Sequence, residues 1–345
     1  MSEKILKALK SLNEKDQSLV KLSRLPTGFY GLDRAIQGGL PRGHAIELSG
    51  HAGYGKTTMS LAIAANVVAS GGKVLFVAAE KNYNALWMQK MGIENIQVLN
   101  NLEEAPNLEG GFHLYDPPYM ERAFDVIRYY LQLNIYDLII IDSIGGAPTR
   151  AELDASFEES QMAQLARLGH KVLRAIPSWL QKSKTALLVI NQVVTNMDYN
   201  PQYPNRNAPW NGQYVPKGAA GWQFFFTMRI ALERVALVFV DKEIVGKEIK
   251  GLIFKSRVSP TPARFSYWLK TELNNQYIDY PIDIRETALA CGIIEQRGAH
   301  WYYKDQHIAK SKEDCERWIQ EDPLAQQMEE ELAAFLLALD SNLTV

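Results

Sequence analysis

The sequence has few cysteines, no long apolar run and no internal repeat. Its 345 residues include two cysteines, Cys291 and Cys315, which cannot form a four-ligand zinc site by themselves and suggest a reduced, intracellular protein. No apolar segment approaches the ~20 residues needed to span a bilayer, and the N-terminal segment MSEKILKALK has no signal-peptide core. We therefore expect a cytoplasmic protein with no membrane association.

A strong net charge is also absent, since the formal net charge at pH 7 is −2. The charges are nevertheless unevenly spread. Residues 276–345 hold 6 Lys/Arg and 14 Asp/Glu, whereas the other 275 residues hold 31 basic and 25 acidic side chains. A mildly basic body with an acidic end permits contacts with nucleic-acid phosphates but does not establish them.

The chain does contain a regular alternation of short apolar runs and helical patterns from about residue 26 onward. This alternation is typical of an α/β fold with a mostly parallel sheet. It predicts strands at residues 44–49, 73–79, 137–141 and 186–190, and helices at residues 57–70, 84–91, 120–133 and 158–182.

The segments outside this alternation suggest how the chain is divided. Residues 1–25 are predicted to form an N-terminal arm with a short helix (3–12) and a strand (18–22), and residues 26–269 the core. Residues 270–345 are predicted to form a small α/β C-terminal domain ending in a helix at 323–339. Within the core, residues 193–221 show no period, which indicates a functional or disordered loop. The runs at 225–232, 235–240 and 248–255 then predict an antiparallel meander.

The most specific motif is a phosphate-binding loop between a predicted strand and a predicted helix. It matches G-x-x-x-x-G-K-[ST] with Gly50, His51, Ala52, Gly53, Tyr54, Gly55, Lys56 and Thr57, and Thr58 follows it. Its glycines let backbone N–H groups converge on phosphate oxygens, Lys56 can reach the β and γ phosphates, and the Thr57 hydroxyl can ligate Mg²⁺. We therefore expect ATP to bind here.

Two acidic residues follow buried strands and complete the expected chemistry. Asp142 ends an apolar run and can hold the Mg²⁺ ion, although alone it would suggest a helix cap or turn. Glu80 ends the strand at 73–79 and can orient or deprotonate the attacking water, although an exposed strand-end glutamate would be equally ordinary.

With these residues in place, the sequence resembles the RecA family of bacterial and phage recombinases over nearly the whole chain. Residues 26–33 and 38–43 resemble the family's approach to its phosphate loop, and residues 76–80 resemble the strand carrying its catalytic glutamate. The resemblance implies a RecA-type ATPase core with a mostly parallel central sheet. It also implies that Asn84 contacts adenine and Trp87 stacks on it.

The resemblance further implies a DNA-binding surface made of two loops, at about residues 152–162 and 193–221. The DNA-binding residues that it implies are Met162, Arg167, Arg174, Lys217, Gly218 and Ala219. Gly218 and Ala219 would offer backbone N–H groups to a phosphate. Without the resemblance, Met162 would be interpreted as helix core, and Arg167 and Arg174 as a solvated helix face.

Other resemblances concern signalling and subunit contacts. Gln192 matches a residue that senses the γ-phosphate and passes the signal to the second DNA loop. Lys255 and Arg257 match a basic pair that reaches the ATP of the adjacent subunit, with Arg257 in place of the usual second lysine, which changes its hydrogen-bond geometry. Phe224 matches an aromatic residue at the interface with the neighbouring subunit.

The second loop also departs from the family, because it is longer than usual and Val194 and Thr195 replace a basic residue and a methionine. In their place it offers Tyr199, Tyr203, Arg206, Trp210, Tyr214 and Lys217. Aromatic side chains can stack on single-stranded bases at ~1–3 kcal/mol each, or they can fold the loop onto itself. The sequence leaves both possibilities open.

The function implied is that of an ATP-dependent homologous recombinase. It would form a helical filament on single-stranded DNA and exchange strands with a homologous duplex, using ATP and Mg²⁺. A hexameric DNA helicase shares the same core and is the first alternative. A regulatory binding protein that keeps the ATPase fold without strand exchange is the second, and the full set of Lys56, Thr57, Glu80, Asp142 and Gln192 argues against it.

Overall fold

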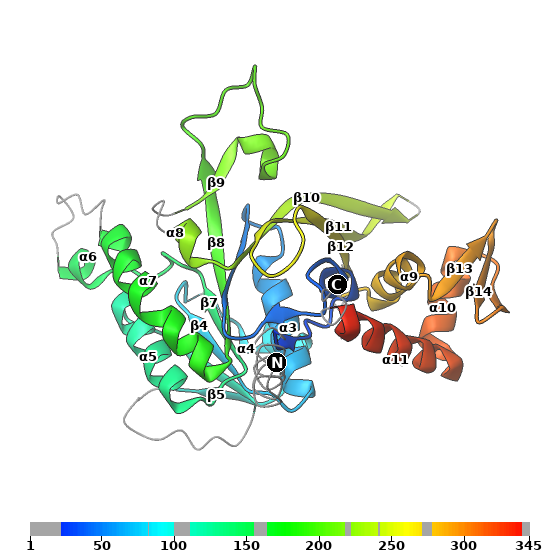
Figure 1. The fold of residues 1–345 in the computed structure, drawn as a ribbon, viewed down its shortest axis with the longest axis horizontal. Coiled ribbons are helices and arrows are strands. Elements are labelled where there is room, and N and C mark those ends of the chain that lie inside the picture. Colours follow the sequence, from blue (N-terminus) through cyan, green and yellow to red (C-terminus); the bar gives the residue numbers. More distant parts are fainter. Residues whose placement is uncertain are drawn as a thin grey trace, which may run out of the picture.

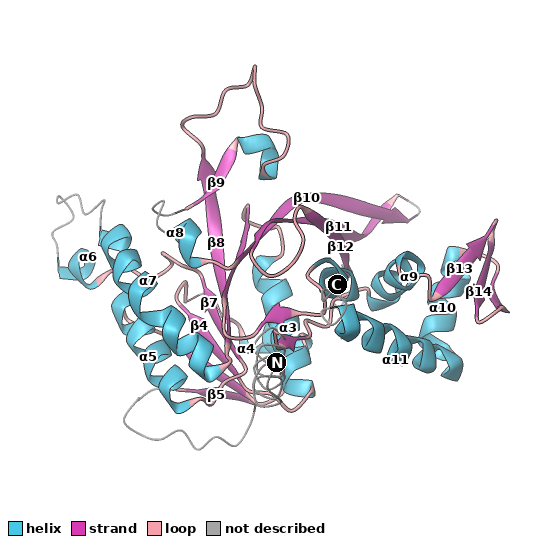
Figure 2. Cartoon of the chain, in the orientation of Figure 1, coloured by secondary structure: helices cyan, strands magenta, loops and turns pink. Residues whose placement is uncertain are grey.

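A computed structural model describes residues 22–81, 83–99, 111–154, 164–217, 222–240, 242–270 and 278–339. A large central sheet runs through the molecule, with helices on both of its faces (Figures 1 and 2). The sequence-predicted arm helix at 3–12 and strand at 18–22 lie outside the described residues, except for Leu22, which is not in a strand. Short strands β1 (Arg24–Leu25) and β2 (Leu40–Pro41) form a separate antiparallel pair.

The six strands on one side of the sheet run parallel, as the alternating pattern predicts. In spatial order they are β3 (Ala45–Gly50), β8 (Ala186–Thr195), β7 (Leu138–Asp142), β4 (Val74–Ala78), β6 (Phe112–Tyr115) and β5 (Ile96–Val98). Four of them, β3, β4, β6 and β7, are buried along their whole length, which explains their continuous apolar runs.

Helices cover the two faces because successive strand residues point to opposite sides. One face, including Phe76 and Ile140, packs on α2 (Tyr30–Ala35), α3 (Lys56–Ala69) and α4 (Ala85–Lys90). The other, including Leu75 and Ile139, packs on α5 (Met120–Leu133) and α7 (Gln164–Ser183), next to the short helix α8 (Trp222–Phe225). The short helix α6 (Arg150–Asp154) lies apart from this core, with no buried residue. The predicted helix at 158–182 is described from residue 164 onward.

The predicted meander is wrong in its strand division. Residues 228–240 form one strand, β10 (Met228–Val240), which runs parallel to β3 at its start and antiparallel to β11 (Glu243–Ser256) along its length. The polar pair at 233–234 suggested a break, but a register shift there lets the strand continue as a β-bulge. A third strand, β12 (Ala263–Lys270), completes the antiparallel edge and was missed.

The segment 193–217 is also more ordered than its lack of period suggested. Strand β8 continues to Thr195 and pairs with β9 (Tyr214–Pro216), and the short 3-10 helix η1 (Pro209–Gly212) precedes β9. Asparagine oxygens at 196, 200 and 205 each accept a backbone N–H two residues further on, at 3.0–3.2 Å. Such local turns have no hydrophobic period, and the sequence pattern therefore could not reveal them. Residues 218–221 lie outside the described part.

The C-terminal part has its own small sheet and core. It contains α9 (Tyr280–Ala290), β13 (Ile294–Arg297), β14 (His300–Tyr303), β15 (Gln306–Ala309), α10 (Lys312–Glu321) and α11 (Pro323–Ala338). Trp301, Tyr303 and Met328 are among its fully buried residues. Asp283 joins it to the core by accepting hydrogen bonds from the backbone of Tyr30 (2.7 Å) and Gly31 (3.0 Å). Of the helices described, none is long and apolar enough to cross a membrane.

Candidate functional site

The phosphate loop connects the carboxyl end of β3 to the first residue of α3. Gly53 and Gly55 have φ angles of 76° and 80°, which side-chain-bearing residues rarely adopt. A Cβ atom at Gly55 would also lie 2.9 Å from both Ile249 Cδ1 and Tyr267 Oη. The sequence motif therefore has the strand–loop–helix context that presents backbone N–H groups and a helix N-terminus to phosphate.

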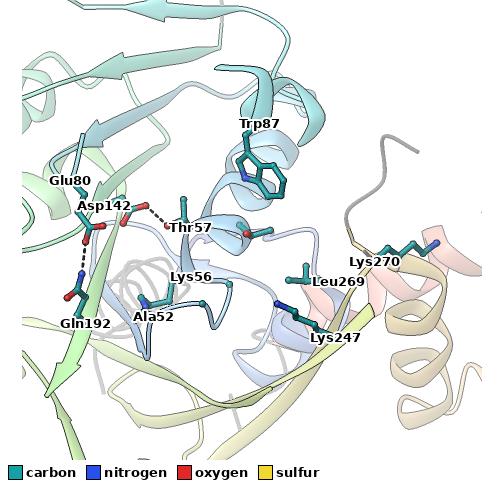
Figure 3. Close-up of a pocket in the computed structure, with 13 residues that line it drawn as sticks. Ala52, Lys56, Thr57, Glu80, Trp87, Asp142, Gln192, Lys247, Leu269 and Lys270 are labelled. Carbon is teal, nitrogen blue, oxygen red and sulfur yellow. Dashed lines mark hydrogen bonds between the residues drawn. The ribbon is translucent and has the colours of Figure 1, made fainter. Parts of the chain in front are cut away.

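A cavity of about 490 Å³ lies beside this loop and gathers residues from distant parts of the chain (Figure 3). Its lining includes most of the predicted nucleotide-site residues and three that were not predicted: Lys247, Leu269 and Lys270. The full lining is Ala52, Gly53, Gly55, Lys56, Thr57, Thr58, Glu80, Trp87, Asp142, Gln192, Lys247, Leu269 and Lys270.

The Lys56 ammonium group lies inside its own loop. Its Nζ donates hydrogen bonds to the carbonyl oxygens of Gly50 (2.9 Å) and His51 (2.8 Å). Burial lowers the pKa of Lys56, and the nearby Asp142 and Glu80 carboxylates oppose that shift. This placement puts one cation where phosphate oxygens would meet the loop.

Thr57 and Asp142 form the candidate metal site. The Thr57 hydroxyl donates a hydrogen bond to Asp142 Oδ2 at 2.6 Å. Burial raises the pKa of Asp142 to about 6, the Thr57 hydrogen bond opposes the shift, and the negative charge of Glu80 adds to it. A partly buried hydroxyl–carboxylate pair fits Mg²⁺, which prefers oxygen ligands and takes the rest from phosphates and water. Within the described residues there is no cluster of three or more His, Cys, Asp or Glu that could hold a metal ion.

Glu80 connects the ends of three parallel strands. It follows β4, and its Oε1 accepts hydrogen bonds from Ser143 Oγ, just after β7, and from Gln192 Nε2 on β8 at 2.9 Å. The structure thus brings Glu80, Asp142 and Gln192, three of the predicted site residues, into the lining of one cavity. A carboxylate held by two donors next to the phosphate loop is suitably placed to orient a water molecule.

Of the two residues expected at adenine, the structure places Trp87 in the cavity lining but not Asn84. Asn84 instead caps α4, since its Oδ1 accepts a hydrogen bond from the Trp87 backbone at 3.2 Å. The cap fixes the start of the helix from which the indole extends into the cavity (Figure 3).

Lys255 and Arg257 lie away from the cavity of their own chain. Lys255 Nζ donates to the carbonyl oxygen of Gln223, and an Arg257 guanidinium nitrogen donates to that of Phe224 at 3.2 Å. The Phe224 side chain beside them is 69% exposed. These three residues form one outward-facing group, and none of them lines the site in cis.

The residues predicted to bind DNA are only partly described. Met162, Gly218 and Ala219 lie outside the described residues, and Arg167 and Arg174 lie on α7, where their side chains are not described. Lys217 is held through its backbone, which donates to the Gln192 carbonyl at 2.7 Å and accepts from Asn191 Nδ2 at 2.8 Å. The loop end is therefore tied directly to the strand that carries Gln192.

The aromatic residues of the 193–217 loop divide into two groups. Tyr214 and Trp210 pack on His51 of the phosphate loop, with ring centroids 4.3 and 5.9 Å from the imidazole, and Trp210 Nε1 donates to Leu232 O at 3.2 Å. Tyr203, by contrast, is 80% exposed. No local pattern indicated the His51 contact, because His51 and its two partners are more than 150 residues apart in the sequence.

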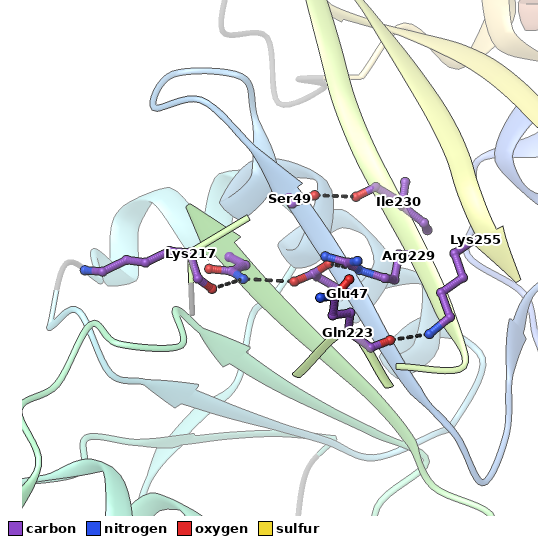
Figure 4. Close-up of polar contacts among 8 residues, drawn as sticks. Glu47, Ser49, Lys217, Gln223, Arg229, Ile230 and Lys255 are labelled. Carbon is purple, nitrogen blue, oxygen red and sulfur yellow. Dashed lines mark hydrogen bonds and ion pairs between the residues drawn. The ribbon is translucent and has the colours of Figure 1, made fainter. Parts of the chain in front are cut away.

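A buried ion pair between β3 and β10 was also missed by the sequence analysis (Figure 4). Glu47 on β3 accepts a 2.6 Å hydrogen bond from Arg229 Nε on β10, and its other oxygen accepts from Asn191 Nδ2 at 2.9 Å. Glu47 is 1% exposed, and Asn191 also binds the Lys217 carbonyl. The only sequence feature that could have indicated this ion pair is Glu47 itself, a single acidic residue inside an apolar strand.

Comparisons with known proteins agree with this geometry. A model of the RecA N-terminal domain matches residues 6–267. Protein RecA of Ehrlichia ruminantium is 24% identical over 332 residues, covering 96% of this chain and 86% of the relative, and that of Thermus aquaticus is 28% identical over 321 residues, covering 91% and 84%. The crystal structure of the RadB recombinase has a similar fold, with a TM-score of 0.50 and 20% identity over 74% of this chain and 98% of that one.

Proposed function

Because the chain belongs to the RecA family, whose members include recombinases, we propose that it is an ATP-dependent DNA strand-exchange protein that forms filaments on single-stranded DNA. The observation that supports this most directly is the single cavity lined by Lys56, Thr57, Glu80, Asp142 and Gln192. A nucleotide site with a direct link to an extended loop is what ATP-controlled DNA binding requires.

In the proposed reaction, the phosphate loop and Lys56 bind the ATP phosphates, and Glu80 accepts a proton from the attacking water as ADP and inorganic phosphate form. Mg²⁺ held by Thr57 and Asp142 would neutralise charge on the phosphates. Gln192 is hydrogen-bonded to Glu80 and, through its carbonyl, to Lys217. It can therefore pass the state of the nucleotide to the DNA loop.

We further propose that each ATP lies between two subunits of a head-to-tail filament, with Lys255, Arg257 and Phe224 facing the next subunit. Residues 1–25 would form the docking arm, and residues 270–345 a C-terminal domain whose acidic balance moderates access of duplex DNA. Truncation after the core tests the last point, which fails if duplex binding is unaltered.

Lys255→Ala is expected to reduce DNA-dependent ATP hydrolysis at least about tenfold. The substitution removes a positive charge that would stabilise the transition state of ATP hydrolysis in the site of the neighbouring subunit. Hydrolysis is measured with saturating single-stranded DNA. Lys250→Ala, on the same strand and paired with Glu248, is the matched control. Wild-type activity in the Lys255 variant would exclude the interfacial site.

Tyr203→Ala is expected to weaken single-strand binding by about 1–3 kcal/mol, because an exposed ring in the loop can stack on a base. Since stacking releases no counterions, the dependence of affinity on salt should stay unchanged. Binding is measured by fluorescence anisotropy over a range of salt concentrations. Phe239→Ala, at an exposed ring on β10, is the control. An equal loss in both variants would contradict a specific role for the loop ring.

A hexameric DNA helicase remains the alternative function with the same core. Electron microscopy with single-stranded DNA and a non-hydrolysable ATP analogue separates the two: filaments support the recombinase, and closed six-membered rings that unwind forked DNA support the helicase.

A further inference from the structure

The hairpin of β11 and β12 covers the phosphate loop from one side. Ile249 pairs with Tyr267, and Lys247 pairs with Leu269. Ile249 Cδ1, Tyr267 Oη and Leu269 Cδ1 are the atoms that a side chain at Gly55 would meet, at 2.9, 2.9 and 3.4 Å. Since residues two apart on a strand share a face, Lys247 is on the face that Ile249 presents to the loop.

Two lysines of this hairpin line the nucleotide cavity but are placed differently (Figure 3). Lys270 extends away from the phosphate loop, and its Nζ lies 3.5 Å from Asp279 Oδ1. Lys247 extends toward the loop. Its ammonium group has no hydrogen-bond acceptor or carboxylate partner within the described ranges, and the adjacent Glu248 is paired with Lys250 at 3.2 Å.

We propose that Lys247 binds a phosphate group of the nucleotide in cis, as a second ammonium group beside Lys56. The inference rests on the proposed nucleotide site. An ammonium group with three donors, directed into a cavity next to a phosphate loop and not compensated by the protein, matches an anionic ligand. Lys255 and Arg257 are proposed to reach the nucleotide of the neighbouring subunit, whereas Lys247 lines the cavity beside the phosphate loop of its own chain. A subunit that has not joined a filament therefore has two ammonium groups for its nucleotide.

The test compares Lys247→Met with Lys250→Met in the full chain without DNA, because Lys250 is an exposed lysine on the same strand that does not line the cavity. Methionine keeps an apolar stem and removes the charge. For ADP and a non-hydrolysable ATP analogue, calorimetry should show about tenfold weaker binding for Lys247→Met, as expected for loss of a charge-assisted hydrogen bond at a partly exposed site. Lys250→Met should bind nearly as wild type does. Lys247→Arg should retain most of the affinity, and thermal unfolding should be alike in all variants.

Adenosine identifies the part of the nucleotide that Lys247 contacts. A phosphate contact predicts that Lys247→Met binds adenosine as wild type does, and an equal loss for adenosine and ADP would overturn the proposal. The loss must also persist in a chain that carries Lys255→Ala, because a cis contact does not need the neighbour.

The proposed function and this inference fail in different ways. If the wild-type chain binds no nucleotide, or if Lys56→Ala has no effect on binding, the nucleotide site itself is wrong. If Lys56→Ala abolishes binding while Lys247→Met changes nothing, the proposal for Lys247 alone is wrong.

Discussion

Glu80→Gln is expected to slow ATP hydrolysis at least about a hundredfold while ATP binding remains nearly unchanged. A positioned general base contributes about 10²–10⁴ to the rate, and an amide cannot accept the proton. The substitution is otherwise conservative, because its amide oxygen can still accept hydrogen bonds from Ser143 Oγ and Gln192 Nε2. Hydrolysis is measured with single-stranded DNA, and binding by calorimetry with ATP.

Glu94→Gln is the matched control for this prediction, since Glu94 is an exposed acid in the loop between α4 and β5 and does not line the cavity. It should hydrolyse ATP as wild type does. Wild-type hydrolysis by the Glu80 variant would remove Glu80 from the chemistry. Loss of ATP binding would instead show that the carboxylate holds the site together.

Arg229→Met is expected to lower the free energy of unfolding by about 3–5 kcal/mol, because it leaves the Glu47 carboxylate buried without its partner. Arg229 has an 11% exposed side chain, and its guanidinium lies 4.9 Å from the centroid of the Phe254 ring. Methionine keeps part of this apolar packing, so the expected cost is mainly electrostatic. Urea unfolding followed by tryptophan fluorescence measures the change.

Two further variants separate the buried charge from other effects. Arg264→Met breaks an ion pair with Glu233 whose arginine is 66% exposed, and it should cost no more than about 1 kcal/mol. Adding Glu47→Gln to Arg229→Met should recover much of the lost stability, because an amide has no charge to leave unpaired. If Arg229→Met and Arg264→Met are equally destabilising, the burial argument fails.

The residues of the site that could be predicted from sequence are those that belong to short local sequence patterns. The phosphate loop has a fixed spacing, and Glu80 and Asp142 each follow an apolar strand whose parallel neighbours bring their ends to one edge of the sheet. Gln192 was assigned to the site by its resemblance to the family's nucleotide-sensing residue, and in the structure it lies on β8, opposite Gly50 at the end of β3.

The missed features depend on contacts between distant segments. Lys247 lines the cavity because the β11–β12 hairpin folds over Gly55. The sequence pattern does not reveal the pairing register of these two strands or their contact with the phosphate loop. β10 was split because Glu233 and Arg234 break its apolar run, whereas the strand continues through a bulge. The order of the 193–217 loop comes from asparagine turns, which satisfy backbone groups locally without producing a period.

Because His51 packs on Tyr214 and Trp210, the residue at position 51 of the phosphate loop cannot be replaced independently of the 193–217 loop. Position 51 is one of the four unspecified places in G-x-x-x-x-G-K-[ST], where relatives are free to differ. In this chain it contacts Tyr214 and Trp210 of the loop that extends from β8, the strand next to β3 in the sheet. A chimera that receives a shorter loop from a relative should therefore also receive that relative's residue at position 51, and the three positions are expected to vary together during evolution.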